Sequence, residues 1–471
     1  MEGYLLREIG RYWSRWHDDN FSILYFLPML KFKSYSIRDL DQIPQMERLS
    51  GKQVDEIRTV SEIYPFKTNN YVLENLIDWN NIPDDPIFRL NFPHREMLIE
   101  EHFDKIEWGK GRLSAEKYAE LIREIRLSLN PHPAGQTYLN MPMDEEGNRL
   151  NGIQHKYEST LLFFPSHGQT CHAYCTFCFR WPQFINDLEL KIQAKEIGPL
   201  INYLNRNKQV TDILITGGDP MVMSAKILSS YIDPLIELDS IRSIRIGSKS
   251  LSYWPHKFVS DPDGEGILEL FRKVVRSGKH LAFMAHFNHP AELATATVRE
   301  AIFNIRQTGA EIRTQAPLLK NINNRPEIWS SMWRAQVELG CIPYYMFLPR
   351  DTGAQHYFAQ TLDDALDIYR GAIQKISGLC RTARGPVMSM TSGKMELLDI
   401  EDGVYSLRYL QHRKPDMTYK VFKTRAKVNN PKWFDDLESY GEAYDPYFDT
   451  SIAGGEYTAE AGAMEGFMAT P

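Results

Sequence analysis

The chain has 471 residues, of which 43% are hydrophobic, so it is long enough for one large domain with extensions or for two domains. Its formal net charge of −7 argues against a general nucleic-acid binder, because phosphate binding usually requires a basic surplus. The sequence contains no apolar run long enough to span a bilayer, no N-terminal signal-peptide pattern, and only five cysteines, too few for a disulfide scaffold. We therefore expect a cytoplasmic protein that acts neither on nucleic acid nor in a membrane.

Residues 1–150 are expected to form a mainly helical N-terminal extension. The clearest helix is predicted over residues 114–129, where Ser114 is a suitable N-cap and apolar residues recur every three to four positions.

From residue 151 to about 415, short apolar runs alternate with longer amphipathic segments. The alternation predicts parallel βαβ units, and so an α/β fold with a partial or complete TIM-like (β/α)6 barrel, whose chemistry would lie at the carboxyl ends of the strands. Strands are predicted over residues 159–165, 212–216, 241–247, 280–287, 311–315 and 344–348, and helices over 190–207, 267–277, 294–309 and 326–340. Residues 416–471 lose this rhythm and are expected to form a C-terminal tail or arm.

Three of the five cysteines, Cys171, Cys175 and Cys178, follow the first predicted strand of this region. Thiolates are the usual ligands of iron–sulfur clusters, and three of them on a four-iron cluster would leave one iron open. A zinc-stabilised binding protein is the alternative, but a closed zinc site would need a fourth ligand such as His167 or His172. The spacing, with an aromatic residue before the last cysteine, resembles that of radical S-adenosylmethionine (SAM) enzymes. The resemblance implies a [4Fe-4S] cluster whose open iron binds SAM.

Other segments at predicted strand ends fit the same site. Gly217 and Gly218, followed by Asp219, would let the backbone approach a ligand closely, and they resemble the segment that receives the SAM amino group. Further polar residues at the next strand ends are expected to complete the SAM-binding layer at the mouth of the barrel: Ser248, His286 and Gln315.

The resemblance narrows to the lysine 2,3-aminomutase family over residues 62 to 415. The segments CHAYCTFCFR, ITGGDP, IRIGSKS, HFNHP, TQAPLLKNIN, PYYMF and GAQHYF occur in that family's order and at similar spacing. The resemblance implies the migration of an amino group between adjacent carbons of an amino acid, with pyridoxal 5′-phosphate (PLP) as a further cofactor. It also implies an electron donor such as flavodoxin or ferredoxin, and a possible homo-oligomer.

Several residues stand where the family places cofactor and substrate contacts. Arg180 matches the arginine that holds the substrate carboxylate, which suits a guanidinium fork. Lys394 matches the catalytic lysine that carries PLP, and Lys156 and Tyr157 match the segment that binds the PLP phosphate. Only Gly393 stands where the family has a run of glycines before that lysine. A PLP-independent radical SAM enzyme that abstracts hydrogen from another small molecule or a peptide is therefore the alternative.

The positions that select the substrate differ from those of the lysine-specific members, which place two carboxylates around the distal ammonium. Val387 stands at one of these positions, and the other aligns with either Arg350 or Asp351. An arginine facing the pocket would repel a distal cation and attract an acid. We therefore expect an acidic, neutral or modified amino acid rather than free lysine.

Overall fold

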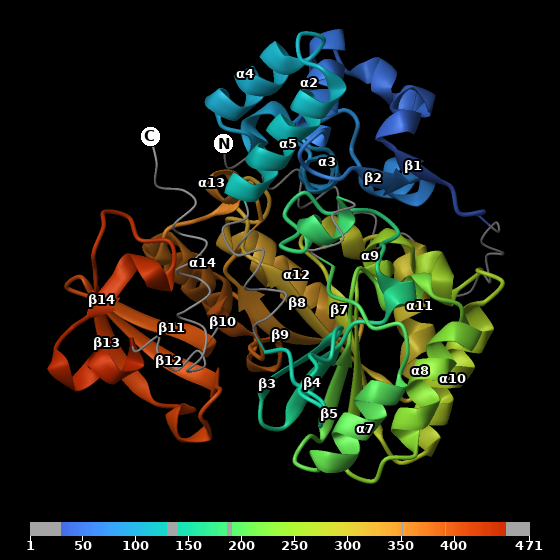
Figure 1. Cartoon of the computed structure of the whole chain (residues 1–471), viewed down its shortest axis with the longest axis vertical. Helices are drawn as coiled ribbons and strands as arrows, with labels where there is room; N and C mark the ends of the chain where they lie inside the picture. The colour runs from blue at the N-terminus through green and yellow to red at the C-terminus, as the bar shows by residue number, and fades with distance from the viewer. Residues whose placement is uncertain (1–29, 130–139, 186–190, 351, 391, 449–471) are drawn as a thin grey trace.

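The computed structural model describes residues 30–129, 140–185, 191–350, 352–390 and 392–448 (Figure 1). The described part of the N-terminal extension contains a two-stranded antiparallel sheet and four α-helices: β1 (Ser34–Ser36), β2 (Lys67–Asn69), α2 (Gly51–Ser61), α3 (Pro86–Asn91), α4 (Glu100–Gly109) and α5 (Ala115–Leu129). The helix predicted over residues 114–129 is confirmed as α5. The hydroxyl of Ser114 accepts a hydrogen bond from the backbone N–H of Lys117 (3.4 Å), as an N-cap does.

A twelve-stranded sheet forms the body of the molecule, and its strands lie in the order β14-β13-β12-β11-β10-β9-β8-β7-β6-β5-β4-β3. Its strands are β3 (Ile153–Tyr157), β4 (Thr160–Phe163), β5 (Asp212–Ile215), β6 (Ser243–Ser248), β7 (His280–His286), β8 (Glu311–Pro317), β9 (Ile342–Phe347), β10 (Arg384–Ser389), β11 (Gly393–Glu401), β12 (Val404–His412), β13 (Val421–Ala426) and β14 (Leu437–Ser439). Neighbouring strands from β4 to β10 are parallel, and the predicted α/β class is therefore confirmed.

Helices follow the parallel strands in chain order. They are α7 (Gly198–Arg206), α8 (Ala225–Ile236), α9 (Ser250–Tyr253), α10 (Gly264–Arg276), α11 (Ala296–Gln307), α12 (Pro326–Glu338), α13 (Gln355–Phe358) and α14 (Leu362–Gln374). The longer ones pack on the outside of the sheet, whereas the one-turn helices α9 and α13 lie beneath the N-terminal extension (Figure 1). The alternation of side chains along β6 explains why helices cover one face of the sheet. Ile244 and Ile246 are fully buried, while the intervening Arg245 is only half-buried and lies on the opposite face. Among the described strands, β3 and β14 are the two edge strands and do not pair with each other, so the sheet is a partial barrel rather than a complete one.

The carboxyl-terminal strands extend the sheet in antiparallel fashion beyond β10. Residues 416–448, the described part of the predicted C-terminal arm, contribute β13 and β14. Phe422 of β13 pairs with Leu407 of β12, and both side chains are fully buried, as is Leu437 of β14. Apolar burial therefore fixes this segment against the sheet.

No helix in the described segments is both long enough and apolar enough to cross a bilayer.

Candidate active site

The cysteine loop, residues 171–178, begins beyond the carboxyl end of β4 and is held by the N-terminal extension. The backbone N–H of Tyr174 donates to the carbonyl of Lys67 in β2 (2.8 Å), and that of Thr176 donates to the carbonyl of Leu90 in α3 (2.9 Å). These bonds satisfy the backbone of a segment that has no helix or strand of its own. The N-terminal extension therefore shapes the loop as well as covering it.

The three predicted cluster cysteines are spread over this loop, at its first, fifth and last residues. Their side chains are half-buried, and the three thiol groups are close enough for their charges to interact. Burial raises the pKa of Cys175 to about 12 and that of Cys178 to about 11, and it raises the pKa of Cys171 well above its usual range. Within the described ranges, no three His, Cys, Asp or Glu side chains are grouped so that they could hold a metal ion.

The glycine pair at the end of β5 lies directly against the backbone that precedes the first cysteine. A Cβ atom on Gly218 would lie 2.4 Å from the carbonyl oxygen of Thr170, and one on Gly217 would lie 2.5 Å from the side-chain amide nitrogen of Gln169. The backbone N–H of Asp219 donates to the carbonyl of Thr170 (2.7 Å). No larger residue could stand at Gly218 without displacing the cysteine loop.

Asp219 connects β5 to β6 from a buried position. Its carboxylate accepts hydrogen bonds from the Ser248 hydroxyl (2.7 Å) and from the backbone N–H groups of Met221 and Lys249 (both 2.9 Å). Burial raises the pKa of Asp219 to about 6, although these hydrogen bonds act in the opposite direction. Two predicted site residues, Asp219 and Ser248, are thus in direct contact, and their contact fixes the loops on which a ligand would rest.

A buried ion pair next to these loops was not predicted from the sequence. The Lys249 ammonium lies 2.6 Å from a Glu292 carboxylate oxygen, and it also donates to the Asn288 side-chain oxygen (2.9 Å) and the His286 carbonyl (3.2 Å). The two charged side chains are only 10% and 0% exposed. The sequence does carry one sign of a structural role for Glu292. It stands three residues after His289, and the two form a capping box at the start of the turn after β7.

His286 and Gln315 lie side by side on β7 and β8, in register with each other. The His286 ring meets the ring of Phe177, in the cysteine loop, edge to face at 5.7 Å. Burial lowers the pKa of His286 well below its usual range, so the ring is neutral at physiological pH. The predicted polar layer therefore reaches the cysteine loop through His286.

Arg180 lies between the cysteine loop and the glycine pair. One of its guanidinium nitrogens donates to the carbonyl of Gly217 (3.2 Å), and the guanidinium lies 4.1 Å from the ring centre of Phe164. Burial lowers the pKa of Arg180 to about 10, which still leaves it charged at neutral pH. A buried cation thus stands beside the cysteines, and its role as the substrate anchor stays a prediction.

The predicted PLP residues lie toward the other end of β4. Tyr157 pairs with Thr160, the first residue of that strand, whereas the cysteine loop follows its last residue. The Lys394 ammonium lies 5.7 Å from the ring centre of Tyr157 and 4.9 Å from that of Tyr345, and it donates to the Gln411 side chain (3.2 Å). Burial lowers the pKa of Lys394 to about 8.

Lys156 holds the turn that carries Lys394. Its ammonium donates to the carbonyl oxygens of Met390 and Gly393, which flank this turn between β10 and β11. Burial, and then the nearby charge of Lys394, lowers the pKa of Lys156 to about 7. Two residues predicted to serve one cofactor are therefore neighbours, although 238 positions separate them in the chain.

Two arginines increase the positive charge around Lys156. The charges of Arg413 and Arg350 both act to lower the pKa of Lys156, and the Arg350 guanidinium lies 5.4 Å from the ring centre of Trp433. We call Lys156, Lys394, Arg350 and Arg413 the basic cluster. Val387, at one position where lysine-specific members have a carboxylate, packs among Tyr345 and Leu410. Asp351 lies outside the described residues.

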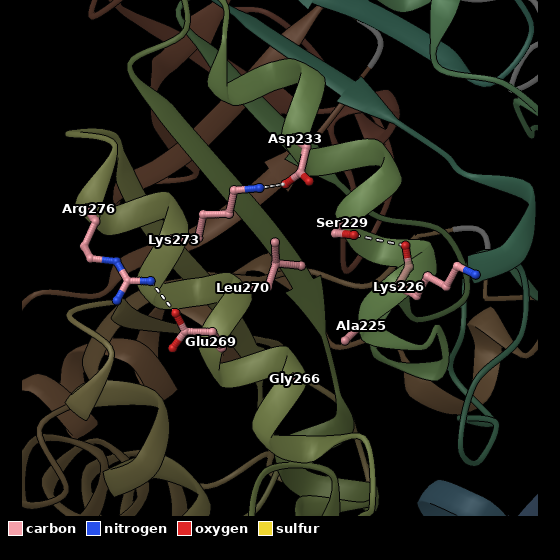
Figure 2. A pocket seen from close by; sticks show the side chains of 9 residues that line it. All are labelled: Ala225, Lys226, Ser229, Asp233, Gly266, Glu269, Leu270, Lys273 and Arg276. Atoms are coloured by element: carbon pink, nitrogen blue, oxygen red, sulfur yellow. Dashed lines mark hydrogen bonds and ion pairs between the residues drawn. The ribbon is translucent and has the colours of Figure 1, made fainter.

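A separate hollow of about 310 Å³ lies between α8 and α10 on the outer layer of helices (Figure 2). Four of the five charged side chains that line it form two ion pairs: Lys273 with Asp233 (2.9 Å), and Arg276 with Glu269. None of the predicted site residues lines it. The hollow therefore belongs to helix packing and not to the candidate active site.

Comparison with known proteins identifies the family. No family model matches the chain. A protein of Aquifex aeolicus (strain VF5), named provisionally as an L-lysine 2,3-aminomutase, is 30% identical over 403 residues, covering 85% of this chain and 93% of the relative. L-lysine 2,3-aminomutase of Methanococcus maripaludis is 23% identical, covering 73% of this chain and 69% of its own, and glutamate 2,3-aminomutase of Clostridioides difficile is 24% identical, covering 71% and 68%.

Among solved structures, Streptococcus suis SuiB bound to precursor peptide SuiA covers 55% of this chain and 50% of its own at 13% identity and a TM-score of 0.33, a likeness too low to carry an argument. The extent and identity of the sequence match, together with the order of the motifs, show that the chain belongs to the lysine 2,3-aminomutase family of radical SAM isomerases.

Proposed function

We propose that this chain is a radical SAM aminomutase that moves an amino group between adjacent carbons of an acidic amino acid. Family membership implies a [4Fe-4S] cluster, SAM and PLP, and when bound these groups supply the radical chemistry. The observation that supports this substrate class is the basic cluster, in which the charges of Lys394, Arg413 and Arg350 all lower the pKa of Lys156. A PLP phosphate and a distal substrate carboxylate would both be attracted to this charge, whereas the ammonium of free lysine would be repelled.

The residues present fit the cofactors that the family uses. Cys171, Cys175 and Cys178 share one loop at a strand end, and thiolates are suitable cluster ligands. Lys394 is buried with a pKa of about 8, so part of its population is the neutral amine that can attack a carbonyl carbon near neutral pH. Lys156 offers a point charge for phosphate.

The distance between the two ends of β4 supports separate places for the cluster and for PLP. β4 runs from Thr160 to Phe163, a rise of about 10 Å at roughly 3.3 Å per residue, between the Tyr157 end and the cysteine end. Arg180 at the cysteine end would hold the substrate α-carboxylate by charge-assisted hydrogen bonds. Lys394 and the basic cluster at the other end would orient PLP and the distal carboxylate. The substrate would then lie between the two ends, inside the partial barrel.

Substrate turnover tests the proposal. Anaerobically purified protein should contain four irons per chain and should form 5′-deoxyadenosine with glutamate in a reductant-dependent reaction, with much less product from lysine. Preference for lysine over glutamate would contradict the assigned substrate class. A colourless protein that binds only zinc after reconstitution would contradict the function itself.

Borohydride trapping tests the role of Lys394. Reduction in the presence of PLP should label Lys394 and should fail in Lys394→Arg, while the exposed Lys420→Arg variant should label as the wild type does. If Lys394 stays unlabelled while deoxyadenosine still forms, the PLP-independent alternative would replace the proposal. The electron donor, such as flavodoxin or ferredoxin, the homo-oligomer and the cytoplasmic location stay predictions.

A further inference from the structure

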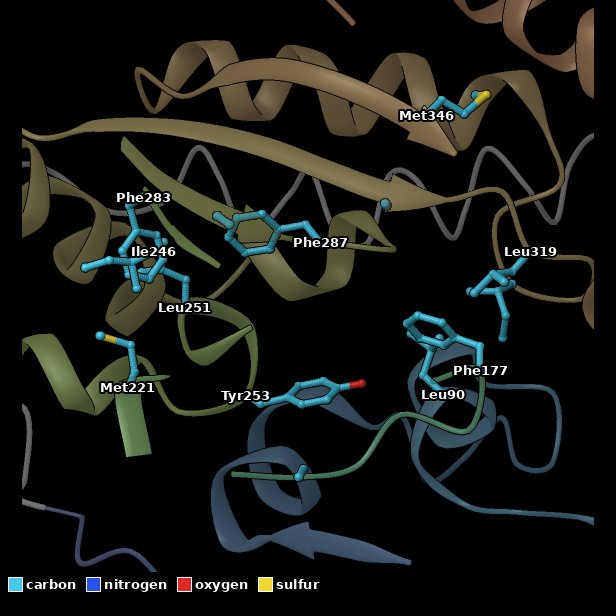
Figure 3. Packing of buried hydrophobic residues seen from close by; sticks show 14 of the residues in the cluster. Leu90, Phe177, Met221, Ile246, Leu251, Tyr253, Phe283, Phe287, Leu319 and Met346 are labelled. Carbon is cyan, nitrogen blue, oxygen red and sulfur yellow. The ribbon is translucent and has the colours of Figure 1, made fainter. Parts of the chain in front are cut away.

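Tyr253 places a buried hydroxyl against the cysteine loop. It ends α9, the short helix after β6, and its side chain lies in a position only 1% exposed to solvent. Its hydroxyl oxygen lies 3.7 Å from the Cys175 sulfur, a hydrogen-bond distance for sulfur. Figure 3 shows the hydroxyl pointing in the direction of Phe177, which stands between Cys175 and Cys178 in the loop.

Neighbouring groups fix this contact from two sides. The Asn69 side-chain amide donates both to the backbone carbonyl of Tyr253 (2.9 Å) and to that of His172 in the cysteine loop (3.2 Å). The Lys249 ammonium, paired with Glu292, lies 4.5 Å from the centre of the Tyr253 ring. One amide thus ties Tyr253 to the loop, and a cation–π contact holds the ring.

The direction of the hydrogen bond depends on the state of Cys175. Between a thiol and a phenol either group can donate, and with Cys175 as a thiol the S–H can donate to the tyrosine oxygen. A cluster ligand is a thiolate and has no proton to give. A phenol is protonated at neutral pH, so in that state the Tyr253 hydroxyl holds the one proton available to this contact.

We propose that Tyr253 donates a hydrogen bond to the Cys175 thiolate of the iron–sulfur cluster and makes the cluster easier to reduce. This inference rests on the proposed function, since it requires that Cys175 bind a cluster. Reduction adds an electron and increases the negative charge on the cysteine sulfurs. A hydrogen-bond donor stabilises the reduced state more than the oxidised one, and such bonds are one of the means by which proteins set cluster potentials.

The variant Tyr253→Phe tests the proposal because it keeps the ring and removes only the hydroxyl. We expect unchanged iron content and SAM binding, and a cluster midpoint potential shifted to a more negative value in a titration followed by electron paramagnetic resonance. At a fixed potential, the ratio of reduced to oxidised cluster should fall by about three- to tenfold, the effect of losing roughly one hydrogen bond's difference between the two states. Tyr71→Phe is the matched control, since it removes a buried hydroxyl bonded to Thr295 (2.7 Å).

A second measurement on the wild type covers the case in which Tyr253→Phe loses its cluster. Transfer into D₂O should shift the iron–cysteine sulfur stretching bands in resonance Raman spectra, because a hydroxyl proton on a thiolate is exchangeable. Equal potentials in the wild type and Tyr253→Phe, or no shift in D₂O, would overturn the inference while leaving the proposed function intact. Failure of the wild type to assemble any cluster would instead overturn the proposed function.

Discussion

Substitution of Gly218 by alanine should destabilise the protein through the cysteine loop. The added Cβ would lie 2.4 Å from the carbonyl oxygen of Thr170 and 2.6 Å from its carbonyl carbon and backbone nitrogen, far inside an ordinary contact of about 3.5 Å. The obstructing atoms are backbone and cannot rotate away. Relief therefore requires the start of the loop to move, and overpacking of this kind costs about 1–3 kcal/mol.

Urea unfolding with a matched glycine variant measures this cost. Gly198→Ala, at the start of α7, is the control because a Cβ there meets no atom within 4 Å. We expect a lower midpoint for Gly218→Ala at unchanged slope, and an equal or slightly higher midpoint for Gly198→Ala. If Gly218→Ala and the wild type had equal midpoints, the prediction would be wrong, because the cysteine loop would have moved with no loss of folding free energy.

Three further predictions follow from charges in the structure. Burial raises the pKa of Asp85 to about 7 from its ordinary 3.8. Between these two pH values the folded protein keeps a proton that the unfolded chain has lost. The stability that this group contributes is therefore fully present below pH 4 and is lost as the pH rises through 7. Asp85→Asn, which keeps an acceptor for the N-cap bond to Phe88, should gain stability relative to the wild type from pH 4 to 7 in unfolding titrations, and a constant difference would contradict this. Glu292→Gln should lower the free energy of unfolding by about 3–5 kcal/mol, because it leaves the buried Lys249 charge without its counter-charge. The double variant with Lys249→Met should lose less stability than the sum of the two single variants. If the two losses were simply additive, the ion pair would not contribute to stability. Arg350→Gln should raise the KM for glutamate at least about tenfold with little change for a neutral amino acid, and an equal effect on both would show that the arginine does not read the distal group.

The prediction from sequence was most successful where the information is local. The three cysteines, the glycine pair and the alternating strands are read from spacings of a few residues, and the structure has every strand predicted between residues 159 and 348. Helices α8 and α14 were not predicted. α8 contains Pro234, which interrupts an otherwise regular pattern, yet its apolar face packs with four buried residues.

The contacts that complete the candidate site were not readable from local patterns. Lys249 and Tyr253 follow β6, whereas Glu292 follows β7 and Cys175 follows β4, so no local pattern relates these three connections to one another. Likewise, β13 of the predicted arm joins the sheet because it can pair with β12, where Phe422 lies opposite the buried Leu407, and β14 then pairs with β13.

The family, the alternating α/β class and the residue types of the cysteine loop can be predicted from the amino-acid sequence, because each is carried by short motifs in a fixed order. The contacts of Lys156 with the turn before Lys394, of Arg350 with the same positive charge and of Tyr253 with Cys175 are visible in the fold alone. These contacts arise because the sheet curves into a partial barrel. Parallel strands then bring together side chains that are far apart in the chain, and burial shifts their pKa values away from those that the isolated residues would have.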